Sequence, residues 1–420
     1  MLAMPDQLMS WLGTHYTMPG GNSLEKLHPS TYLLVAAFLL ACLESGDPFR
    51  LLLAWCRMRP AYIVYALVIL GVSGSLVIRH GLSGVAFAAD TLLRPALFAL
   101  LLMLLDHRVR DRLFLFIVGF VVANSCLGIV EVLTNWRLIP YMLGGEPVLE
   151  QHFRATAMMG HPLDNALATA LTLIFVAGHI HGQVLKGALI LLLGLGLLAF
   201  GGRTALFAGL MGLVLVAFVN LIDELRSGSF TYMRGILRLL AMLFGPLAIA
   251  GVIVGTDIGQ RIFAKLAWEG SAQARLEAFR FVSMMTSDEI WFGIAASRFD
   301  QLLESLNTVQ VVENFWLILL ARFGLIAFVP FCIAFIAFLY RLSREGDWKV
   351  KVAVVIFLLI ASSNNSLATK KPALCILVCL TMTSMVHTRR IRSSVPAGRR
   401  IAVRSRLPAR RPGVPADGAK

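Results

Sequence analysis

Charged residues are scarce in this chain. Asp, Glu, Lys and Arg make up only 15% of its 420 residues, whereas 58% are hydrophobic and the mean hydropathy is +0.76. Soluble domains carry more charge, so the composition excludes that class and indicates a polytopic membrane protein. Only helices and closed barrels satisfy their backbone polar groups in lipid, and the continuous apolar runs of this sequence favour helices.

Motifs for several kinds of chemistry are also missing. There is no zinc, P-loop or dinucleotide fingerprint, and no repeat at a fixed period that would support an inverted-repeat transporter. The six cysteines lie in or beside apolar segments, where we expect them to act as small core residues. Cys375 and Cys379 share a helix face but have no His or carboxylate neighbours in the sequence. We therefore expect neither a metal nor another cofactor.

Apolar runs of membrane length recur along the chain. About 20 apolar residues cross a hydrocarbon core of about 30 Å. The runs predict an all-α fold with about eleven spans, in a range of about 10 to 12. These predicted spans cover residues 29–45, 61–78, 83–105, 112–133, 163–180, 184–200, 203–222, 236–255, 312–340, 350–367 and 371–388. The stretch 312–340 could instead hold a short re-entrant piece that breaks near 322–324 before a full span.

Polar stretches divide the chain into regions. The polar turn 44–48 already breaks the short first span. The predicted regions are an N-terminal segment 1–28, a bundle of about eight spans over 29–255, a large loop 256–311, C-terminal spans over 312–388 and a tail 389–420.

Basic residues fall on alternating sides of the predicted spans, and short cytoplasmic loops are the ones enriched in Lys and Arg. One side collects Arg50, Arg57, Arg59, Arg108, Arg110, Arg112, Lys186, Arg226, Arg234, Arg238, Arg341, Arg344, Lys349 and Lys351. The basic tail 389–420 joins this side, which we take as cytoplasmic. The outer side then holds the N-terminus, the segment 134–162, the turn 201–202, the loop 256–311 and the segment 362–371.

The C-terminal tail mixes Arg with Pro, Gly and Ala, a composition typical of disorder. Much of the net charge of +14 is therefore a consequence of topology. Attraction to anionic lipid of the inner leaflet, at about 1 kcal/mol per basic residue, is a simpler explanation of the tail than nucleic-acid binding. We expect membrane lipid, and no nucleic acid, among the partners.

Arg203 begins a predicted span directly after the turn Gly201-Gly202. This position is unfavourable twice, because it places a cation at the positive end of a helix and on the outer side of the membrane. An anion held by both the helix N-terminus and the guanidinium would remove both penalties. The alternative is an arginine that reaches outward to headgroup phosphates.

A second polar group precedes the span 163–180. Arg154 is followed by His161, Asp164 and Asn165, and polar side chains so close to lipid usually line a cavity or pair with one another. The alternative for Asp164 is helix capping after Pro162. We regard His161 and Asn165 as candidate substrate residues and Arg154 as a candidate anion ligand.

Asp90 and Arg94 lie four residues apart inside the predicted span 83–105, hence on one helix face. Charges at this spacing can neutralise each other in lipid. The pattern predicts a structural ion pair.

The large outer loop contains an amphipathic pattern. Over residues 273–282, Arg275 lies near one face with Phe279 and Val282, which predicts a helix on the membrane surface. Arg280, in the same stretch, is a possible substrate-binding residue.

Glu313 lies where the chain returns to lipid, next to Asn314. Partial desolvation at this boundary would raise the pKa of the Glu313 carboxyl and suit it to general-base catalysis. The alternative is a carboxylate at a helix N-terminus that faces water. Asn314 is a further candidate substrate residue.

The order of these motifs resembles a known family. The motifs are Arg154, Gly160-His161-Pro162 with Asn165, Gly202-Arg203-Thr204, Arg275 with Phe279, Glu313-Asn314-Phe315, and Leu320 with Phe323-Gly324-Leu325. Together they look like the O-antigen ligase and Wzy-type polysaccharide polymerase superfamily, and more closely its exopolysaccharide polymerase branch. The resemblance covers about residues 85–345.

This resemblance implies an inverting, metal-independent glycosyltransferase of GT-C-like helical architecture in the bacterial inner membrane, active on the periplasmic face. It would move a glycan from undecaprenyl diphosphate to the hydroxyl of an acceptor lipid-linked repeat, together with other polysaccharide-export components. Arg203 and Arg275 would hold the diphosphate, with Arg154 as a third ligand. Glu313 or His161 would be the base.

One departure from the family pattern bears on the reaction. Many ligases have His-Asn where this chain has Glu313-Asn314, which puts ligase chemistry in doubt. Glu can still accept the proton of the acceptor hydroxyl, so a polymerase remains chemically reasonable. An O-antigen ligase that transfers glycan to lipid A-core, and a transporter of lipid-linked oligosaccharide, are the alternatives.

Overall fold

The computed structural model describes residues 4–17, 21–22, 24–81, 85–143, 146–147, 153–180, 182–227, 279–306, 312 and 314–394. Helices dominate these residues. The strands among them are β1 (Met142–Leu143) and β2 (Glu146–Pro147), which pair antiparallel. The fold is all-α, as the apolar runs predict.

The described helices follow the predicted apolar runs closely. In chain order they are α1 (Asp6–Trp11), α2 (Pro29–Glu44), α3 (Pro48–Met58), α4 (Pro60–His80), the π-helix η2 (Ala88–Leu93), α5 (Arg94–Leu104), α6 (His107–Thr134), the 3-10 turn η3 (Ala157–Met159), α7 (Pro162–His179), α8 (Gln183–Phe200), α9 (Arg203–Ser227), α13 (Ser287–Phe292), α14 (Ala296–Ser305), α15 (Phe315–Glu345), α16 (Trp348–Ser362) and α17 (Ala373–Ser394).

Several of these helices are suited to a membrane. Among the described residues, α4, α6, α8, α9 and α15 are long and apolar enough to cross one, and α2 with α3 would make a sixth span if the pair, bent by 108°, crosses as one. These helices support a multi-pass membrane protein. The count of about eleven spans and the side that each end faces stay predictions.

Several other predicted spans are not single described helices of membrane-crossing length. The span predicted over 83–105 is divided into the π-helix η2 and the 11-residue α5, and α16 has only 15 residues. The span predicted over 236–255 and most of the loop 256–311 lie outside the described residues. Helix α17 continues to Ser394, so the first residues of the predicted tail 389–420 are helical.

Three predicted breaks are confirmed. Helix α2 ends at Glu44 and α3 begins at Pro48. The turn between α8 and α9 is made by Gly201, whose φ is +66°, a value that glycine adopts without strain. Within α15 the backbone is non-helical at Gly324, where φ is +70°, so this helix consists of a short piece and a long one.

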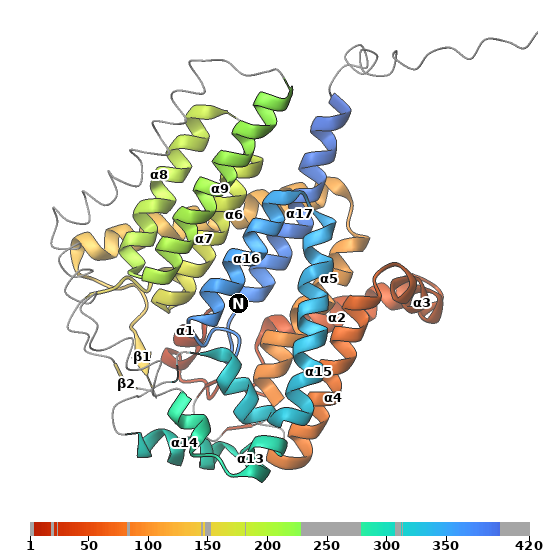
Figure 1. Cartoon of the computed structure of the whole chain (residues 1–420), viewed down its shortest axis with the longest axis vertical. Helices are drawn as coiled ribbons and strands as arrows, with labels where there is room; N and C mark the ends of the chain where they lie inside the picture. The colour runs from red at the N-terminus through yellow and green to blue at the C-terminus, as the bar shows by residue number, and fades with distance from the viewer. Residues whose placement is uncertain are drawn as a thin grey trace, which may run out of the picture.

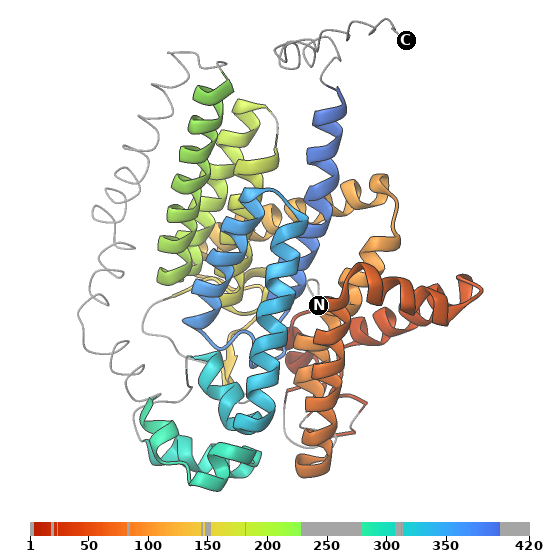
Figure 2. The same cartoon turned by 45° about the vertical axis from the view of Figure 1, so that its right-hand side comes forward.

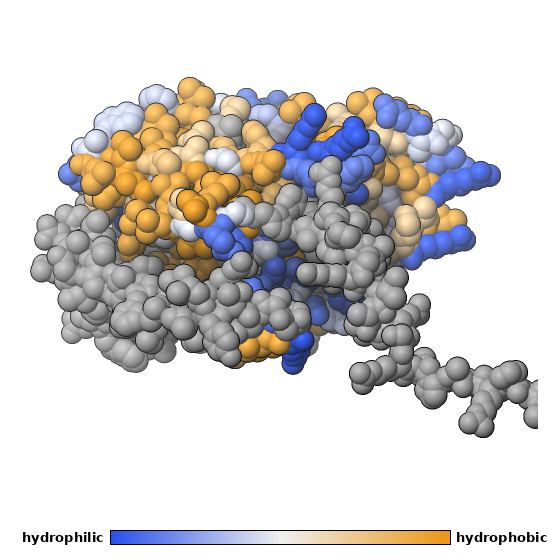
Figure 3. Space-filling model, turned by 90° about the horizontal axis from the view of Figure 1, so that it is seen from above, coloured by the Kyte–Doolittle hydropathy of each residue, from blue (hydrophilic) through white to orange (hydrophobic). Residues whose placement is uncertain are grey.

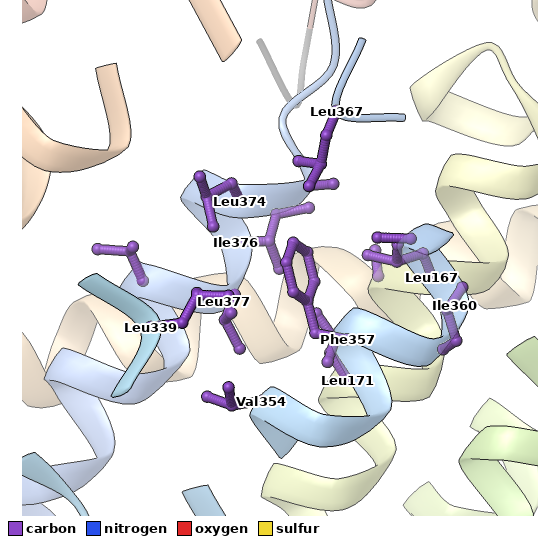
Figure 4. Packing of buried hydrophobic residues seen from close by; sticks show 14 of the residues in the cluster. Leu167, Leu171, Leu339, Val354, Phe357, Ile360, Leu367, Leu374, Ile376 and Leu377 are labelled. Atoms are coloured by element: carbon purple, nitrogen blue, oxygen red, sulfur yellow. The ribbon is translucent and has the colours of Figure 1, made fainter. Parts of the chain in front are cut away.

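Helix α7 is the centre of the bundle. It packs against α8, α9, α16 and α17, and nearly all of its residues are buried. Figure 4 shows Leu167 and Leu171 of α7 pointing toward Phe357 and Ile360 of α16. These contacts enclose the inner face of the bundle and fix the position of the N-terminal end of α7.

Small residues bring the helices close together, as is usual where lipid removes the hydrophobic drive for helix association. A Cβ added to Gly196 of α8 would lie 2.7 Å from the Ser125 side chain of α6. A Cβ on Gly202 would lie 2.6 Å from Cβ of Ala166. The α8–α9 turn is therefore seated directly on the first turns of α7.

Contacts group the helix ends into two sets. At one end, Nζ of Lys349 donates to the Gly178 carbonyl and Nη2 of Arg341 donates to that of Met58. At the other end, the Arg79 guanidinium lies over the Phe292 ring at 5.4 Å. In Figures 1 and 2, α13 and α14 lie together at the lower end, opposite the last turns of α17. Which side of a membrane each set faces stays a prediction.

Large apolar side chains remain exposed on the outer faces of the candidate spans, as expected for lipid contact. Examples are Ile78 of α4, Val184 of α8 and Ile333 of α15, whose exposed fractions are 87%, 88% and 68%. Seen from above, hydrophobic residues cover much of the visible surface and hydrophilic side chains gather in clusters (Figure 3).

Candidate functional site

Asp164 in the first turn of α7 belongs to a buried ion cluster. Its side chain is 3% exposed, and its Oδ2 lies 3.1 Å from Nζ of Lys371 in the segment between α16 and α17. The Ser366 hydroxyl donates to Oδ1 at 3.2 Å. The residue at the N-cap position of α7 is His161, whose side chain makes no cap hydrogen bond. Asp164 therefore holds a distant lysine, and its place near the helix N-terminus is favourable as well.

Lys371 lies between two carboxylates. Its Nζ is 2.8 Å from Oδ2 of Asp6 in α1 as well as 3.1 Å from Asp164, and its side chain is only 8% exposed. Burial lowers the pKa of Lys371, but the two carboxylates outweigh this effect, so the pKa is raised overall. The lysine stays charged and ties α1 to the N-terminal end of α7.

His161 lies beside this cluster. Its Nδ1 is 3.5 Å from Oδ2 of Asp164, and the ring of Tyr141 meets the imidazole edge-on at 5.5 Å between centroids. Burial, followed by the charge of Lys371 and then that of Arg154, lowers the pKa of His161 to about 3. The imidazole is therefore neutral at physiological pH and able to accept a proton, although its basicity is low.

Asn165 is occupied by protein contacts. Its Oδ1 accepts from Nδ2 of Asn124 in α6 at 2.9 Å, and its Nδ2 donates to the Thr156 carbonyl. The Asn124 oxygen in turn accepts from the backbone N–H of Met158. Both Asn side chains are fully buried, and together they hold the segment before α7 in place.

Glu131 of α6 organises the same segment. Its carboxylate, which is fully buried, accepts three backbone N–H groups, those of Leu138, Thr156 and Ala157, at 2.8 to 2.9 Å. Three amide donors replace much of the hydration that a buried carboxylate loses. Glu131 therefore fixes the backbone that carries Arg154.

Arg154 lies across the α8–α9 turn. A Cβ added to Gly201 would lie 3.2 Å from Cδ of Arg154, and the N–H of Ala155 donates to the Ala199 carbonyl. Arg203 is the first residue of α9, directly after this turn. The structure thus brings Arg154 to the turn that carries Arg203, and the charge of Arg154 also acts on His161.

Asn314 begins α15 close to the same end of the bundle. Its Oδ1 accepts from the N–H groups of Trp316 and Leu317, so it is the N-cap of that helix. The N–H of Phe315 donates to the Asn364 carbonyl in the segment that also carries Ser366 and Lys371. Asn314 is therefore connected to the α7 site through this segment.

Two predicted site residues, Glu313 and Arg275, lie outside the described residues. Arg280 is described, is exposed, and lies on the helical turn that leads toward α13. The predicted roles of all three stay predictions.

Asp90 and Arg94 take part in a second polar cluster. The Asp90 carboxylate is fully buried and accepts from the Tyr16 hydroxyl, the Thr31 hydroxyl and the His28 backbone N–H. Nη1 of Arg94 donates to the Ser30 hydroxyl. Asp90 thus anchors the N-terminal segment, and its ion pair with Arg94 stays a prediction.

The N-terminal segment contributes residues that the sequence alone did not indicate. Lys370 donates to the carbonyls of Tyr16 and Lys26 and lies 4.1 Å from the Tyr16 ring centroid. Figure 1 shows α1 beside the connection between α16 and α17. One signal could have revealed this role, because two adjacent lysines in a short outer segment are unusual on that side of a membrane.

Comparison with known proteins gives no assignment. No protein-family model matches this sequence, and no curated protein matches it significantly. Within the described residues, no three His, Cys, Asp or Glu side chains gather into a group that could hold a metal ion. The case for a function therefore depends on the site and on the family resemblance of the motifs.

Proposed function

We propose that this chain is a membrane glycosyltransferase of the polysaccharide polymerase type. It would transfer a glycan from undecaprenyl diphosphate to the hydroxyl of an acceptor lipid-linked repeat. The observation that supports this most is the position of Arg154, whose side-chain stem crosses Gly201 at the turn that carries Arg203. Two guanidiniums at the N-terminal end of a helix are suited to a diphosphate.

The chemistry needs stabilisation of a leaving group. The bond between the anomeric carbon and the diphosphate oxygen breaks, a bond forms to the acceptor hydroxyl oxygen, and a base takes the hydroxyl proton. Negative charge grows on the diphosphate as it leaves. Arg203 and Arg154, with Arg275 as a further ligand, would stabilise that charge more in the transition state than in the ground state.

The base would be His161 or Glu313. The neutral imidazole of His161 lies next to Asp164, which can orient the ring through Nδ1 and leave Nε2 as the proton acceptor. Catalytic hydrogen bonds at such sites are often long in the absence of substrate and shorten when substrate binds. A bound diphosphate would also raise the pKa of His161, because it places negative charge beside the ring.

The experiment is chain extension by purified protein in lipid nanodiscs. The substrate is undecaprenyl-diphosphate-linked repeat, supplied without ATP and with EDTA, and product length is read by gel and mass spectrometry. We expect longer glycans on the lipid. A product of unchanged length, with repeat moved across a vesicle membrane, would contradict the proposal and support a transporter. Transfer only to lipid A-core would support a ligase.

A further inference from the structure

We propose that Lys371 is a positioning residue of this site: held by Asp6 of the N-terminal segment, it fixes the Asp164 carboxylate beside His161. The inference rests on the proposed function for its kinetic consequences. The N-terminal segment contributes to the site because Asp6 contacts Lys371, which is far away in the sequence.

The Asp164 carboxylate lies between the Lys371 ammonium group and the His161 imidazole. Oδ2 of Asp164 lies 3.1 Å from Nζ of Lys371 and 3.5 Å from Nδ1 of His161, while Oδ1 accepts from Ser366. Lys371 and Ser366 hold the carboxylate with Oδ2 3.5 Å from Nδ1, a separation at which the two atoms do not yet form a hydrogen bond. When substrate binding shortens this contact to a hydrogen bond, the carboxylate selects the tautomer with hydrogen on Nδ1, which leaves the lone pair on Nε2 for a substrate hydroxyl.

Lys371 needs Asp6 to occupy this position. A lysine that is 8% exposed is costly to bury unless it is paired, and a single carboxylate would leave part of its hydrogen-bonding capacity unused. Asp6 supplies the shorter of its two contacts, 2.8 Å against 3.1 Å. Helix α1, which carries Asp6, is itself held through Tyr16 and Lys370.

Charged side chains from several described elements surround His161. They are Asp164 of α7, Lys371 of the α16–α17 segment, Asp6 of α1 and Arg154, with the Tyr141 ring at its edge. Lys371 and Arg154 lower the pKa of His161, whereas Asp6 raises it. Removing the Lys371 charge leaves two carboxylates nearby, so the pKa of His161 rises and the imidazole becomes protonated at a higher pH.

The first test needs no activity. Diethyl pyrocarbonate acylates neutral imidazole, and the side chain of His161 is 18% exposed, so peptide mass spectrometry can follow its modification against pH in the full-length protein. In the wild type we expect labelling to persist from about pH 8 to about pH 5, well above the lowered pKa. In Lys371→Met the pKa of His161 rises, so we expect the loss of labelling on acidification to begin at a higher pH than in the wild type. The control Lys351→Met, at an exposed residue of α16, keeps the wild-type profile.

The second test is kinetic and uses the extension assay. Lys371→Met should lower kcat about tenfold or more, equal to about 1.4 kcal/mol, with little change in KM for the lipid-linked donor. Lys371→Arg keeps the charge and should recover much of kcat, and Asp6→Asn should lower kcat by a smaller factor. If Lys371→Met fails to fold, as judged by gel filtration, the Lys371→Arg and Asp6→Asn results decide.

The outcomes separate the two proposals. Absence of extension in the wild type overturns the polymerase function but leaves the labelling result valid for Lys371. Extension with unchanged kcat in Asp6→Asn and Lys371→Met, or unchanged labelling of His161 in Lys371→Met, overturns the positioning role. Equal losses in Lys371→Met and Lys371→Arg, with no change in the labelling profile, indicate a purely structural lysine and also overturn it.

Discussion

Gly293 and Gly324 pack backbone against backbone, where the end of α13 meets the break in α15. A Cβ on Gly293 would lie 2.6 Å from the Arg322 carbonyl oxygen, and a Cβ on Gly324 would collide with the Phe292 backbone. The N–H of Ile294 donates to the Ala321 carbonyl at 2.8 Å. Two glycines thus allow the described end of the large loop to dock on the broken helix.

Replacing Gly324 by Ala tests this contact. Alanine at this position would need φ near +70°, which is strained for a residue with a Cβ, and its Cβ would be forced into the Phe292 backbone. We therefore expect the free energy of unfolding to fall by more than about 1 kcal/mol. The measurement is the thermal midpoint in detergent. Gly187→Ala in α8 is the matched control, because a Cβ there meets open space and helix propensity favours Ala. Equal midpoints for both variants would contradict the close contact.

Glu131→Gln tests how the segment before α7 is held. One oxygen of the carboxylate becomes an NH2 group that faces backbone N–H donors, so at least one of the three hydrogen bonds is lost and a donor is left unsatisfied. We expect a destabilisation of about 2 kcal/mol and reduced extension activity, because Arg154 lies on this segment.

The control for this variant is Glu304→Gln at an exposed position of α14. It removes the same charge without a buried bond, so its stability should stay within about 0.5 kcal/mol of the wild type. Indistinguishable midpoints for the two Gln variants would show that the Glu131 carboxylate does not hold the segment.

The protein should lose stability as the pH falls below about 6.5, in part through His28. Its Nδ1 accepts from the Ser30 N–H, so the proton of the neutral ring is on Nε2, which donates to the Met4 carbonyl. Burial lowers the pKa of His28 from 6.5 to about 4. The unfolded chain therefore binds a proton before the folded one does, and stability present above pH 6.5 is lost between 6.5 and about 4.

The measurement for this pH dependence is the thermal midpoint across that range for the wild type and for His28→Asn. Asn can still accept at the helix cap but does not titrate, so its midpoint should fall less on acidification. His161 contributes a loss of the same sign in both proteins. A steeper fall in His28→Asn would contradict the assignment.

Local patterns account for the parts of the fold that the sequence could predict. The Gly201-Gly202 turn, the break at 44–48 and the kink at Gly324 are set by residues adjacent to one another, and each lies where the sequence indicates. The approach of Arg154 to the Arg203 turn could also be predicted, because both were assigned to one side of the membrane.

The parts that could not be predicted depend on long-range pairs. Nothing near Asp6 in the sequence points to Lys371, and periodicity carries no information about which buried carboxylate meets which lysine. The partners of the Glu131 carboxylate are backbone N–H groups, which have no sequence signature. For the same reason the sequence could not show that Asp164 holds Lys371, although Asp164 does lie in the first turn of α7.

The most direct test of the proposed function is the extension assay with Arg203→Ala beside Arg344→Ala. Arg344 lies in the last turn of α15, at the end of the bundle away from Arg203, and controls for loss of an arginine. If Arg203 stabilises the departing diphosphate, Arg203→Ala lowers kcat by about 100-fold or more, while Arg344→Ala extends glycans at nearly the wild-type rate. Wild-type extension by Arg203→Ala would contradict the assignment of this end of the bundle as a diphosphate site.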